Sequence, residues 1–344
     1  MQHEITSRHA LLDSAGRLVE PGYTKGLLMD YDRRAIKGGA LRIKEWDYYL
    51  IHAGSFAVAL TIADNSYMGL DSISLLDFTG VPWEHTNSPM SFMTMGKRNF
   101  PGGSDSGSVE SGNGKYSIRF AHNGDHRMLT FSMDDFKDGK PIKGEIRLEN
   151  PDQESMVICT PYKEKKTAFY YNQKINCMPA SGWVEYAGKT YTLRKGEAWG
   201  TLDWGRGVWT YKNTWYWGSA SWTVDGVPFG WNIGYGFGDT SAASENMLFY
   251  GGKAHKLSQV RFNIPMKDGK EDYMSPWTFT SDDGRFEMDF KPYLDRASKT
   301  DVLIICSDQH QVFGLFTGEV RLDDGTIIQV NDLPGFAEKV MNKW

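Results

Sequence analysis

The sequence predicts an all-β protein with two domains and one short helix at its C-terminal end. Two observations lead to this prediction. From residue 41 onward, short runs of β-forming residues follow one another, and turn signals such as Asn123-Gly124-Asp125 separate them. Such a series is typical of antiparallel barrels and sandwiches. The chain also has 344 residues, which is more than one hydrophobic core usually organises.

The expected elements follow in chain order. Residues 1–40 contain few alternating segments, so we expect them to form an extended arm. Candidate strands then occupy residues 41–190, the expected N-terminal β-barrel domain, and residues 191–344, the expected C-terminal β-barrel domain. At the end of the second domain we interpret Asp332–Lys343 as the helix, because Asp332 suits an N-cap and Pro334 suits a first turn.

The first candidate strand mixes charged and aromatic residues. Alternation places Trp46 and Tyr48 on one face of this strand. The other face carries Glu45, Asp47 and Tyr49, and we interpret it as the exterior of the barrel in preference to a second acid site.

The strongest local signal lies in residues 198–239, which hold seven of the twelve tryptophans and nine of the 37 glycines. At their centre, Asp225-Gly226 predicts a β-hairpin closed by a two-residue type I′ turn. A turn of this length sets the register of both strands. The expected pairs are Val224 with Val227, Trp222 with Phe229, and Tyr216 with Tyr235.

Alternation along this hairpin gives it two unlike faces. One face should pack in a core and carries Tyr216, Trp222, Phe229, Trp231, Ile233, Tyr235 and Phe237. The other face mixes aromatic and polar groups, as cavities for small amphipathic ligands do; it carries Trp215, Trp217, Ser219, Ser221 and Asn232. A structural alternative is that tryptophan simply covers cross-strand glycine. The candidate substrate-binding residues are Trp209, Tyr211, Trp215, Trp217, Ser219, Asn232 and Tyr235.

Charged residues flank this second face. The candidate catalytic residues are Asp203, Arg206, Asp239 and Glu245. A carboxyl group among aromatic side chains loses solvation, which raises its pKa and makes it a general acid for an alkene or a carbonyl. Indole faces would stabilise a cation formed in this way. In the structural alternative, Asp203 and Arg206 form an ion pair and Asp239 caps a turn.

Composition and missing motifs narrow the class of function. The net charge of −5 argues against nucleic acid or an anionic membrane surface as the main partner. The sequence has no GxGxxG, P-loop, GxSxG or HExxH motif, and its eight histidines are scattered, so we expect no cofactor and no metal. Three cysteines without CxxC spacing, no signal peptide and no apolar run of membrane length predict a cytoplasmic protein.

Several runs of sequence carry a family resemblance. They are Asp203-Trp-Gly-Arg-Gly-Val-Trp, Thr214-Trp-Tyr-Trp-Gly-Ser-Ala-Ser, Asn232-Ile-Gly-Tyr-Gly-Phe-Gly-Asp-Thr-Ser-Ala-Ala-Ser-Glu-Asn and Gly314-Leu-Phe-Thr-Gly-Glu-Val-Arg-Leu-Asp-Asp-Gly-Thr. Over nearly the whole chain the sequence resembles the domain of unknown function family 2804. That family is distantly similar to the carotenoid 1,2-hydratase and AttH-like group, whose members look like two lipocalin-like barrels in tandem. Relatives include hydratases of isoprenoid alkenes or plant phenolics and fungal pericyclases. The resemblance implies the tandem architecture and a hydrophobic small-molecule substrate.

These observations support hypotheses from different classes. In the favoured one, the protein is a cofactor-independent enzyme that hydrates, dehydrates, isomerises or cyclises an isoprenoid, polyketide or phenolic by acid catalysis. In the second, it is a non-catalytic lipocalin-like carrier of a lipid, terpenoid or phenolic. A third possibility is carbohydrate recognition by exposed tryptophans. The sequence leaves the substrate, the direction of reaction and the oligomeric state open.

Overall fold

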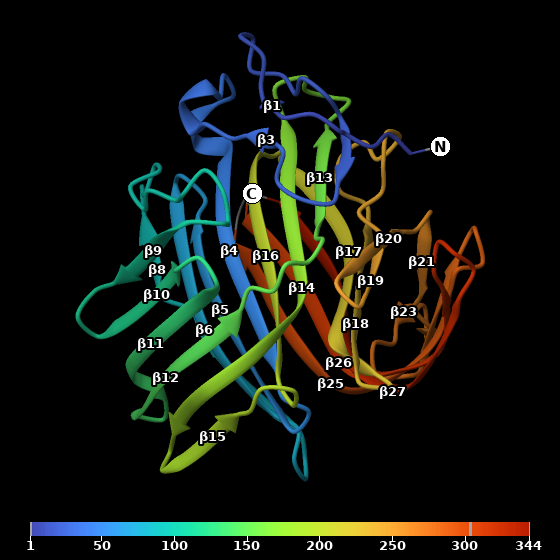
Figure 1. The fold of residues 1–344 in the computed structure, drawn as a ribbon. Coiled ribbons are helices and arrows are strands. Elements are labelled where there is room, and N and C mark those ends of the chain that lie inside the picture. Colours follow the sequence, from blue (N-terminus) through green and yellow to red (C-terminus); the bar gives the residue numbers. More distant parts are fainter. Residues whose placement is uncertain (1, 303–304, 344) are drawn as a thin grey trace.

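The computed structural model describes residues 2–302 and 305–343 and consists mainly of two large β-sheets that lie side by side (Figure 1). Every pairing within these two sheets is antiparallel. The all-β prediction is therefore confirmed. None of the helices in the described part of the chain is long and apolar enough to cross a membrane.

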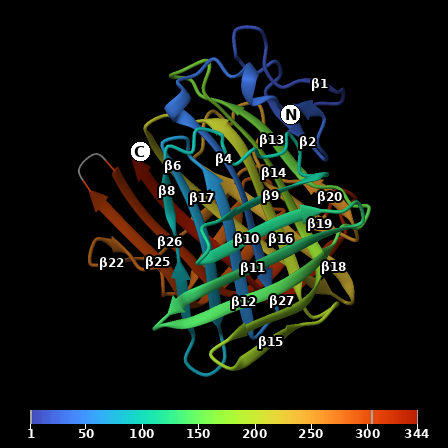
Figure 2. The same cartoon turned by 90° about the vertical axis from the view of Figure 1, so that its left-hand side faces the viewer.

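The first sheet contains 14 strands. Its main path runs in the order β7 (Trp83–Asn87), β6 (Met68–Asp77), β5 (Phe56–Asp64), β4 (Ile43–His52), β16 (Trp199–Val208), β14 (Phe169–Tyr186), β12 (Lys140–Glu149), β11 (His126–Lys137), β10 (Tyr116–His122) and β9 (Gly107–Gly112). At its margins lie β8 (Met90–Phe92), β15 (Lys189–Leu193), β13 (Met156–Pro161) and β2 (Gly22–Thr24). In the view turned by 90°, β10, β11 and β12 cross in front of β4, β14 and β16 (Figure 2), so the sheet curls over itself.

The second sheet contains nine strands. Their order is β20 (Lys253–Lys256), β19 (Met247–Tyr250), β18 (Val227–Tyr235), β17 (Lys212–Val224), β27 (Ile327–Lys343), β26 (Ile305–Arg321), β25 (Phe286–Val302), β24 (Trp277–Ser281) and β21 (Val260–Asn263). Outside both sheets lie β1 (His9–Ala10), β3 (Met29–Asp30), β22 (Met266–Lys267), β23 (Lys270–Glu271) and the 3-10 turns η1 (Arg33–Ala35) and η2 (Ala40–Arg42). Both large sheets are open: in the described chain no ladder joins β7 to β9 or β20 to β21.

The chain passes from one sheet to the other between β16 and β17. Strand β16 pairs with β14 and β4, so it belongs to the first sheet although it lies beyond residue 190. Strand β17 starts the second sheet at Lys212. The division of the chain into domains at residues 190 and 191 stays a prediction about folding units, whereas the change of sheet occurs after Val208.

The hairpin β17–β18 has the predicted register. Val224 pairs with Val227, and Tyr216 pairs with Tyr235. At the turn, Asp225 and Gly226 have φ of 51° and 78°, and positive values at both positions define a type I′ turn. The hairpin prediction is confirmed.

The predicted C-terminal helix is wrong. Asp332–Lys343 lies in β27, which pairs with β17 on one side and β26 on the other. Asp332 has φ of 49° and does not cap a helix. A central strand that is buried on both faces does not alternate between apolar and polar residues, so its pattern resembles that of a buried helix.

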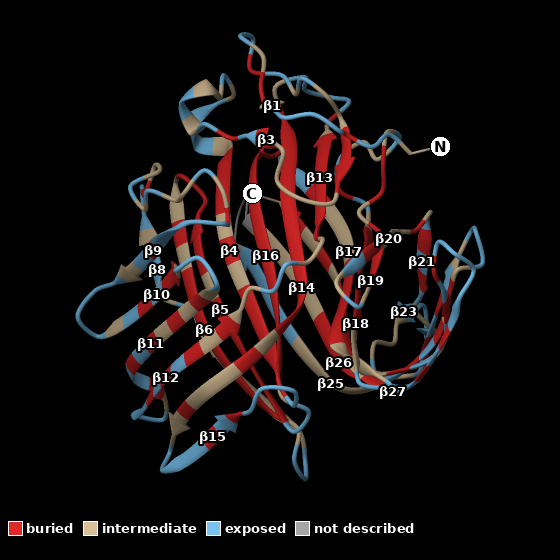
Figure 3. Ribbon diagram, in the orientation of Figure 1, coloured by how far each residue is buried: buried red, intermediate tan, exposed pale blue. Residues whose placement is uncertain are grey.

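The sheets pack through their central strands, which are the most buried parts of the molecule (Figure 3). Between them lies an apolar cluster of residues from both sheets: Leu50, Ala57, Ala59, Leu76, Trp217, Phe313 and Phe336. A separate core fills the concave side of the second sheet and includes Phe229, Trp231 and Ile233. The face of β4 that carries Glu45 and Asp47 is buried as well, so its interpretation as a barrel exterior is wrong. Glu45 pairs with Arg33 of η1, and Asp47 pairs with Arg206 of β16.

Candidate active site

The candidate site lies where β14 and β16 of the first sheet face β17, β18 and β27 of the second. Asn176 Nδ2 donates to Ser219 Oγ at 2.8 Å, and Lys174 Nζ lies 3.7 Å from the centre of a ring of Trp217. Alternation on β17 therefore brings its mixed aromatic and polar face against the first sheet. The predicted second face of the hairpin is the one at this interface.

Asp203 and Lys174 form an ion pair at this interface. Their side chains lie 2.9 Å apart on paired positions of β16 and β14. Asn172 Nδ2 also donates to Asp203 Oδ1, at 2.6 Å. All three residues are buried, and a buried charge requires such partners.

Glu338 on β27 places a second carboxyl group nearby. Trp215 Nε1 donates to its Oε1 and Gln311 Nε2 to its Oε2, both at 3.0 Å. Burial raises the pKa of Glu338 to about 7, and it outweighs the hydrogen bond from Trp215 and the charge of Lys174. A group with a pKa near 7 can both give and accept a proton at neutral pH.

Glu245 supplies a third carboxyl group. Its Oε1 lies over Gly234, where an added Cβ would come within 2.7 Å of it. Asn232 Nδ2 donates to the backbone oxygen of Glu245 at 2.9 Å, while Asn232 Oδ1 accepts from Trp217 Nε1 at 2.7 Å. Burial raises the pKa of Glu245 against the opposing charge of Lys174.

The cluster therefore contains more acids than bases. We call Lys174, Asp203, Glu245 and Glu338 the acid cluster. Lys174 favours ionisation of both glutamates, whereas Asp203 opposes it. Burial outweighs the charge of Lys174 at both glutamates, and also that of Lys256 at Glu245, so both glutamates hold a proton more readily than exposed ones do. Among the residues that the structure describes, no three His, Cys, Asp or Glu side chains are placed to hold a metal ion.

Beside the acid cluster lies a group of packed rings. We call its members the aromatic group: Trp46, Tyr170, Trp209, Trp215 and Phe237. Ring centres of Phe237 lie 4.6 Å from those of both Tyr170 and Trp209. Burial raises the pKa of the Tyr170 hydroxyl, and all three carboxyl groups of the acid cluster add to this effect, so Tyr170 lies next to them. The aromatic group thus forms an apolar wall of the site.

Phe237 was expected on the core face of the hairpin, and this is wrong. Gly236 has φ of 94° and follows the last residue of β18. The left-handed backbone at this glycine interrupts the alternation. Phe237 therefore joins the interface side instead of the second core.

The structure brings only some of the predicted site residues together. Asp203, Glu245, Trp215, Trp217, Ser219 and Asn232 lie at the interface, and Trp209 belongs to the aromatic group. Tyr211 is exposed beside Arg42. Tyr235 lies on the opposite face of the hairpin, stacked on Tyr216 with 4.5 Å between ring centres.

Arg206 and Asp239 lie apart from the acid cluster. Arg206 is three residues from Asp203 on β16 and therefore points to the opposite face, where it pairs with Asp47 at 3.0 Å. The ion pair between Asp203 and Arg206, which belonged to the structural alternative, is not formed, because each residue pairs with another partner. Asp239 pairs with Lys163 at 3.6 Å and accepts from Ser241 N at 3.1 Å. Partial burial would raise the pKa of Asp239, but the hydrogen bonds from Ser241 and the charge of Lys163 outweigh it and lower that pKa.

Sequence reasoning did not select Glu338, Gln311, Lys174 or Tyr170. Glu338 lay in the segment interpreted as a helix, so its alternation with Phe336 and Val340 was not used. Lys174 alternates with Asn172 and Asn176 on β14, and three polar residues on one face of an otherwise buried strand were an available signal.

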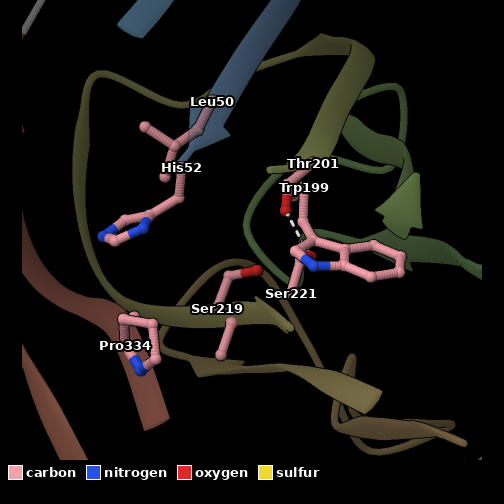
Figure 4. Close-up of a pocket in the computed structure, with 9 residues that line it drawn as sticks. Leu50, His52, Trp199, Thr201, Ser219, Ser221 and Pro334 are labelled. Carbon is pink, nitrogen blue, oxygen red and sulfur yellow. Dashed lines mark hydrogen bonds between the residues drawn. The ribbon is translucent and has the colours of Figure 1, made fainter. Parts of the chain in front are cut away.

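A small cavity adjoins the site. Its lining includes Leu50, His52, Trp199, Thr201, Ser219, Ser221 and Pro334 (Figure 4). Its volume of about 10 Å³ is room for one water molecule. Burial lowers the pKa of His52 to about 4, so this ring is neutral at neutral pH.

Fold and site together define an all-β protein in which two curved antiparallel sheets enclose a cluster of buried acids. Within that class, the chain belongs to the family described as Domain of unknown function (DUF2804), whose model matches residues 2–344. None of the curated proteins matches it in sequence.

Solved structures share the fold at low sequence identity. A provisionally assigned AttH from Nitrosomonas europaea has a TM-score of 0.55 at 11% identity, over 90% of this chain and 96% of that one. Kievitone hydratase from Nectria haematococca has a TM-score of 0.50 at 8% identity, over 88% of each chain. CghA has a TM-score of 0.48 at 10% identity, over 100% and 97%. The first two confirm the expected resemblance to the AttH-like fold; at such identities the likeness concerns fold alone.

Proposed function

We propose that this protein is an acid catalyst for a hydrophobic small molecule bound between the two sheets, with Glu338 as the general acid. The proposal depends on the observation that burial raises the pKa of Glu338 to about 7. Aromatic rings that suit an apolar substrate lie beside this carboxyl group. Hydration or dehydration, isomerisation and cyclisation all begin with such a proton transfer. A relative of similar fold is named as a hydratase of kievitone, which supports hydration as the first reaction to test.

In the hydration of an alkene, Glu338 donates its proton to one alkene carbon and becomes a carboxylate. The adjacent carbon becomes cationic and is stabilised by the ring face of Trp215 and the negative charge of Asp203. Water then adds to this carbon, and its surplus proton returns to the carboxylate of Glu338, either directly or through Glu245. Alkene and water together give the alcohol, and the reverse sequence is dehydration. The proposal requires no cofactor.

The remaining residues hold these groups in place. Lys174 pairs with Asp203 and lies over Trp217, so it holds the Asp203 side chain in place at the interface. Gln311 donates to Glu338 and orients the acid. The aromatic group leads from the acid cluster toward the exposed Tyr211 through Trp209 and Trp215, and we assign this side to ligand entry.

The test uses a panel of isoprenoid alkenes and phenolics incubated with the protein in ¹⁸O-labelled water. Mass spectrometry then detects addition of labelled water. Glu338→Gln should lower the rate by roughly 10²- to 10⁴-fold, the usual contribution of a general acid. Glu319→Gln is the matched control, because Glu319 is exposed on the neighbouring strand β26. Equal rates for wild type and Glu338→Gln would remove Glu338 from the mechanism.

A carrier function is the second candidate, and one observation favours it. The Glu338 carboxyl already accepts hydrogen bonds from Trp215 and Gln311, as a purely structural group would. A carrier releases its ligand chemically unchanged. Mass spectrometry of ligand recovered from denatured protein after long incubation separates the two functions, because an enzyme leaves product and a carrier does not.

A further inference from the structure

A second site is suggested by the hairpin Pro265–Ser275, which connects β21 to β24. Its strands β22 and β23 form a two-stranded sheet of their own and join neither large sheet in the described chain. At the turn, Asp268 and Gly269 both have positive φ. In Figure 1, β23 lies within the curve of the second sheet. We call this segment the cover hairpin.

Two side chains attach the cover hairpin to the second sheet. The carboxylate of Glu271 accepts from Lys339 Nζ at 2.6 and 2.7 Å and from the hydroxyl of Tyr273 at 2.7 Å. The ring of Tyr273 stacks on His310, with 3.8 Å between centres and 13° between planes. The carboxylate of the hairpin therefore binds a cation of the sheet, and the aromatic ring of the hairpin covers an aromatic ring of the sheet.

The surface beneath is built by neighbouring strands. Tyr216, Lys339 and His310 occupy paired positions on β17, β27 and β26. Tyr216 also stacks on Tyr235, and Phe262 meets both rings edge-on at 5.9 and 5.5 Å. These side chains point away from the acid cluster, since Lys339 follows Glu338 on the same strand. The surface is therefore on the other face of the second sheet.

We propose that this surface is a binding site for a small aromatic anion and that Glu271 and Tyr273 occupy it as an internal ligand. An aryl carboxylate or sulfonate presents the same two groups that the cover hairpin presents. Its anionic group would replace Glu271 at Lys339, and its ring would replace Tyr273 on His310.

The cover hairpin is suited to leave this surface. The side chains of Lys339 and Glu271 are 23% and 26% exposed, and ion pairs in contact with solvent contribute little to stability. The hairpin contributes no strand to the sheet that it covers. A ligand that takes the place of Glu271 and Tyr273 therefore displaces the ion pair with Lys339, the stack on His310 and the hydrogen bond from Trp277 Nε1 to the Tyr273 backbone oxygen, but no hydrogen bond between strands of the large sheet.

The experiment measures fluorescence titration with 8-anilinonaphthalene-1-sulfonate, an aromatic anion. Glu271→Ala should bind this probe at least tenfold more tightly than wild type, because the internal carboxylate no longer competes. The double variant Glu271→Ala/Lys339→Met should lose that gain. Neutral N-phenyl-1-naphthylamine should show no comparable gain with Glu271→Ala. Glu319→Ala, which removes an exposed carboxylate elsewhere on the sheet, should behave as wild type.

The proposal is overturned if Glu271→Ala binds the anionic probe with wild-type affinity, or if the gain persists without Lys339. A gain shared by the neutral probe also overturns it, because exposed apolar surface alone would explain that result. Near-ultraviolet circular dichroism checks that each variant is folded. If Glu271→Ala does not fold, Tyr273→Phe removes only the hydroxyl donor and should give a smaller gain in the same direction; its absence overturns the proposal.

Discussion

The two faces of the hairpin β17–β18 are made by the same strands, yet only one of them meets buried acids. On one face, Phe229, Trp231 and Ile233 lie in the core of the second sheet. On the other, Trp217 and Asn232 lie against the first sheet and its partner groups. Both faces are rich in aromatic rings. Aromatic content alone therefore does not identify a site, whereas the groups that lie opposite each face do.

The two faces of the hairpin differ in what surrounds their rings: other rings on the core face, and carboxyl groups on the interface face. In the core of the second sheet, rings such as those of Trp231 and Phe316 meet edge to face at 5.0 Å, an arrangement stabilised by burial and ring geometry. At the interface, rings surround carboxyl groups, so burial acts on ionisation as well as on packing. Removing a ring on the first face should therefore lower the free energy of unfolding. On the second face, a change in the protonation of a carboxyl group should also have an effect.

The largest effect is expected for Trp231→Ala on the core face. Trp231 is fully buried, and removing a buried tryptophan side chain typically lowers the free energy of unfolding by about 3–5 kcal/mol. Urea denaturation measures this loss. Trp222→Ala, at a half-buried position of the same face, should cost clearly less. Equal losses at the two positions would contradict the assignment of this face to a core.

A slightly smaller effect that depends on pH is expected for Glu338. Its pKa rises from an ordinary value of 4.5 to about 7 on folding. A raised pKa contributes stability that is fully present below pH 4.5 and is lost as the pH rises through 7. Relative to Glu338→Gln, the wild type should lose about 3 kcal/mol of unfolding free energy across this range. Urea denaturation of both proteins at pH 4.5 and 7.5 measures the difference between their free energies of unfolding. If this difference is the same at both pH values, folding does not raise the pKa of Glu338.

Trp217→Phe tests the polar contacts of the interface face. It keeps a ring against Phe336 but removes the donor to Asn232 Oδ1. A buried acceptor that loses its partner costs about 1–3 kcal/mol. We expect a loss in this range by thermal or urea unfolding. Tyr216→Phe, on the other face of the same strand, is the control for loss of a polar group outside the interface.

The smallest effect is expected for Asp239→Asn. Its ion pair with the exposed Lys163 should contribute no more than about 1 kcal/mol. Turnover by this variant should stay within about twofold of wild type, because the structure keeps Asp239 apart from the acid cluster. Asp203→Asn, which disrupts the ion pair with Lys174, should have a clearly larger effect on turnover. The reverse ranking would return Asp239 to the catalytic group.

Several features were predictable because they depend on near neighbours in the chain. The register of β17–β18 follows from the turn Asp225-Gly226, since two residues leave one way to pair the strands. The separation of Asp203 from Arg206 also follows from the two-residue period of a strand, although it was not applied to this pair. The failure at Asp332–Lys343 has the opposite cause: β17 and β26 pair with that segment along its two edges, and its two faces are buried by the core of the second sheet and by the interface with the first.

The all-β class, the register of the central hairpin and the face on which each residue of its two strands lies could be predicted from the sequence. These features depend on local backbone geometry and on alternation. Tertiary packing is what brings Glu338 and Lys174, 164 positions apart in the numbering, into one buried cluster with Asp203 and Glu245. The pKa of Glu338 depends on burial, on the charges of Lys174 and Asp203 and on hydrogen bonds from Trp215 and Gln311, and no local pattern contains that information.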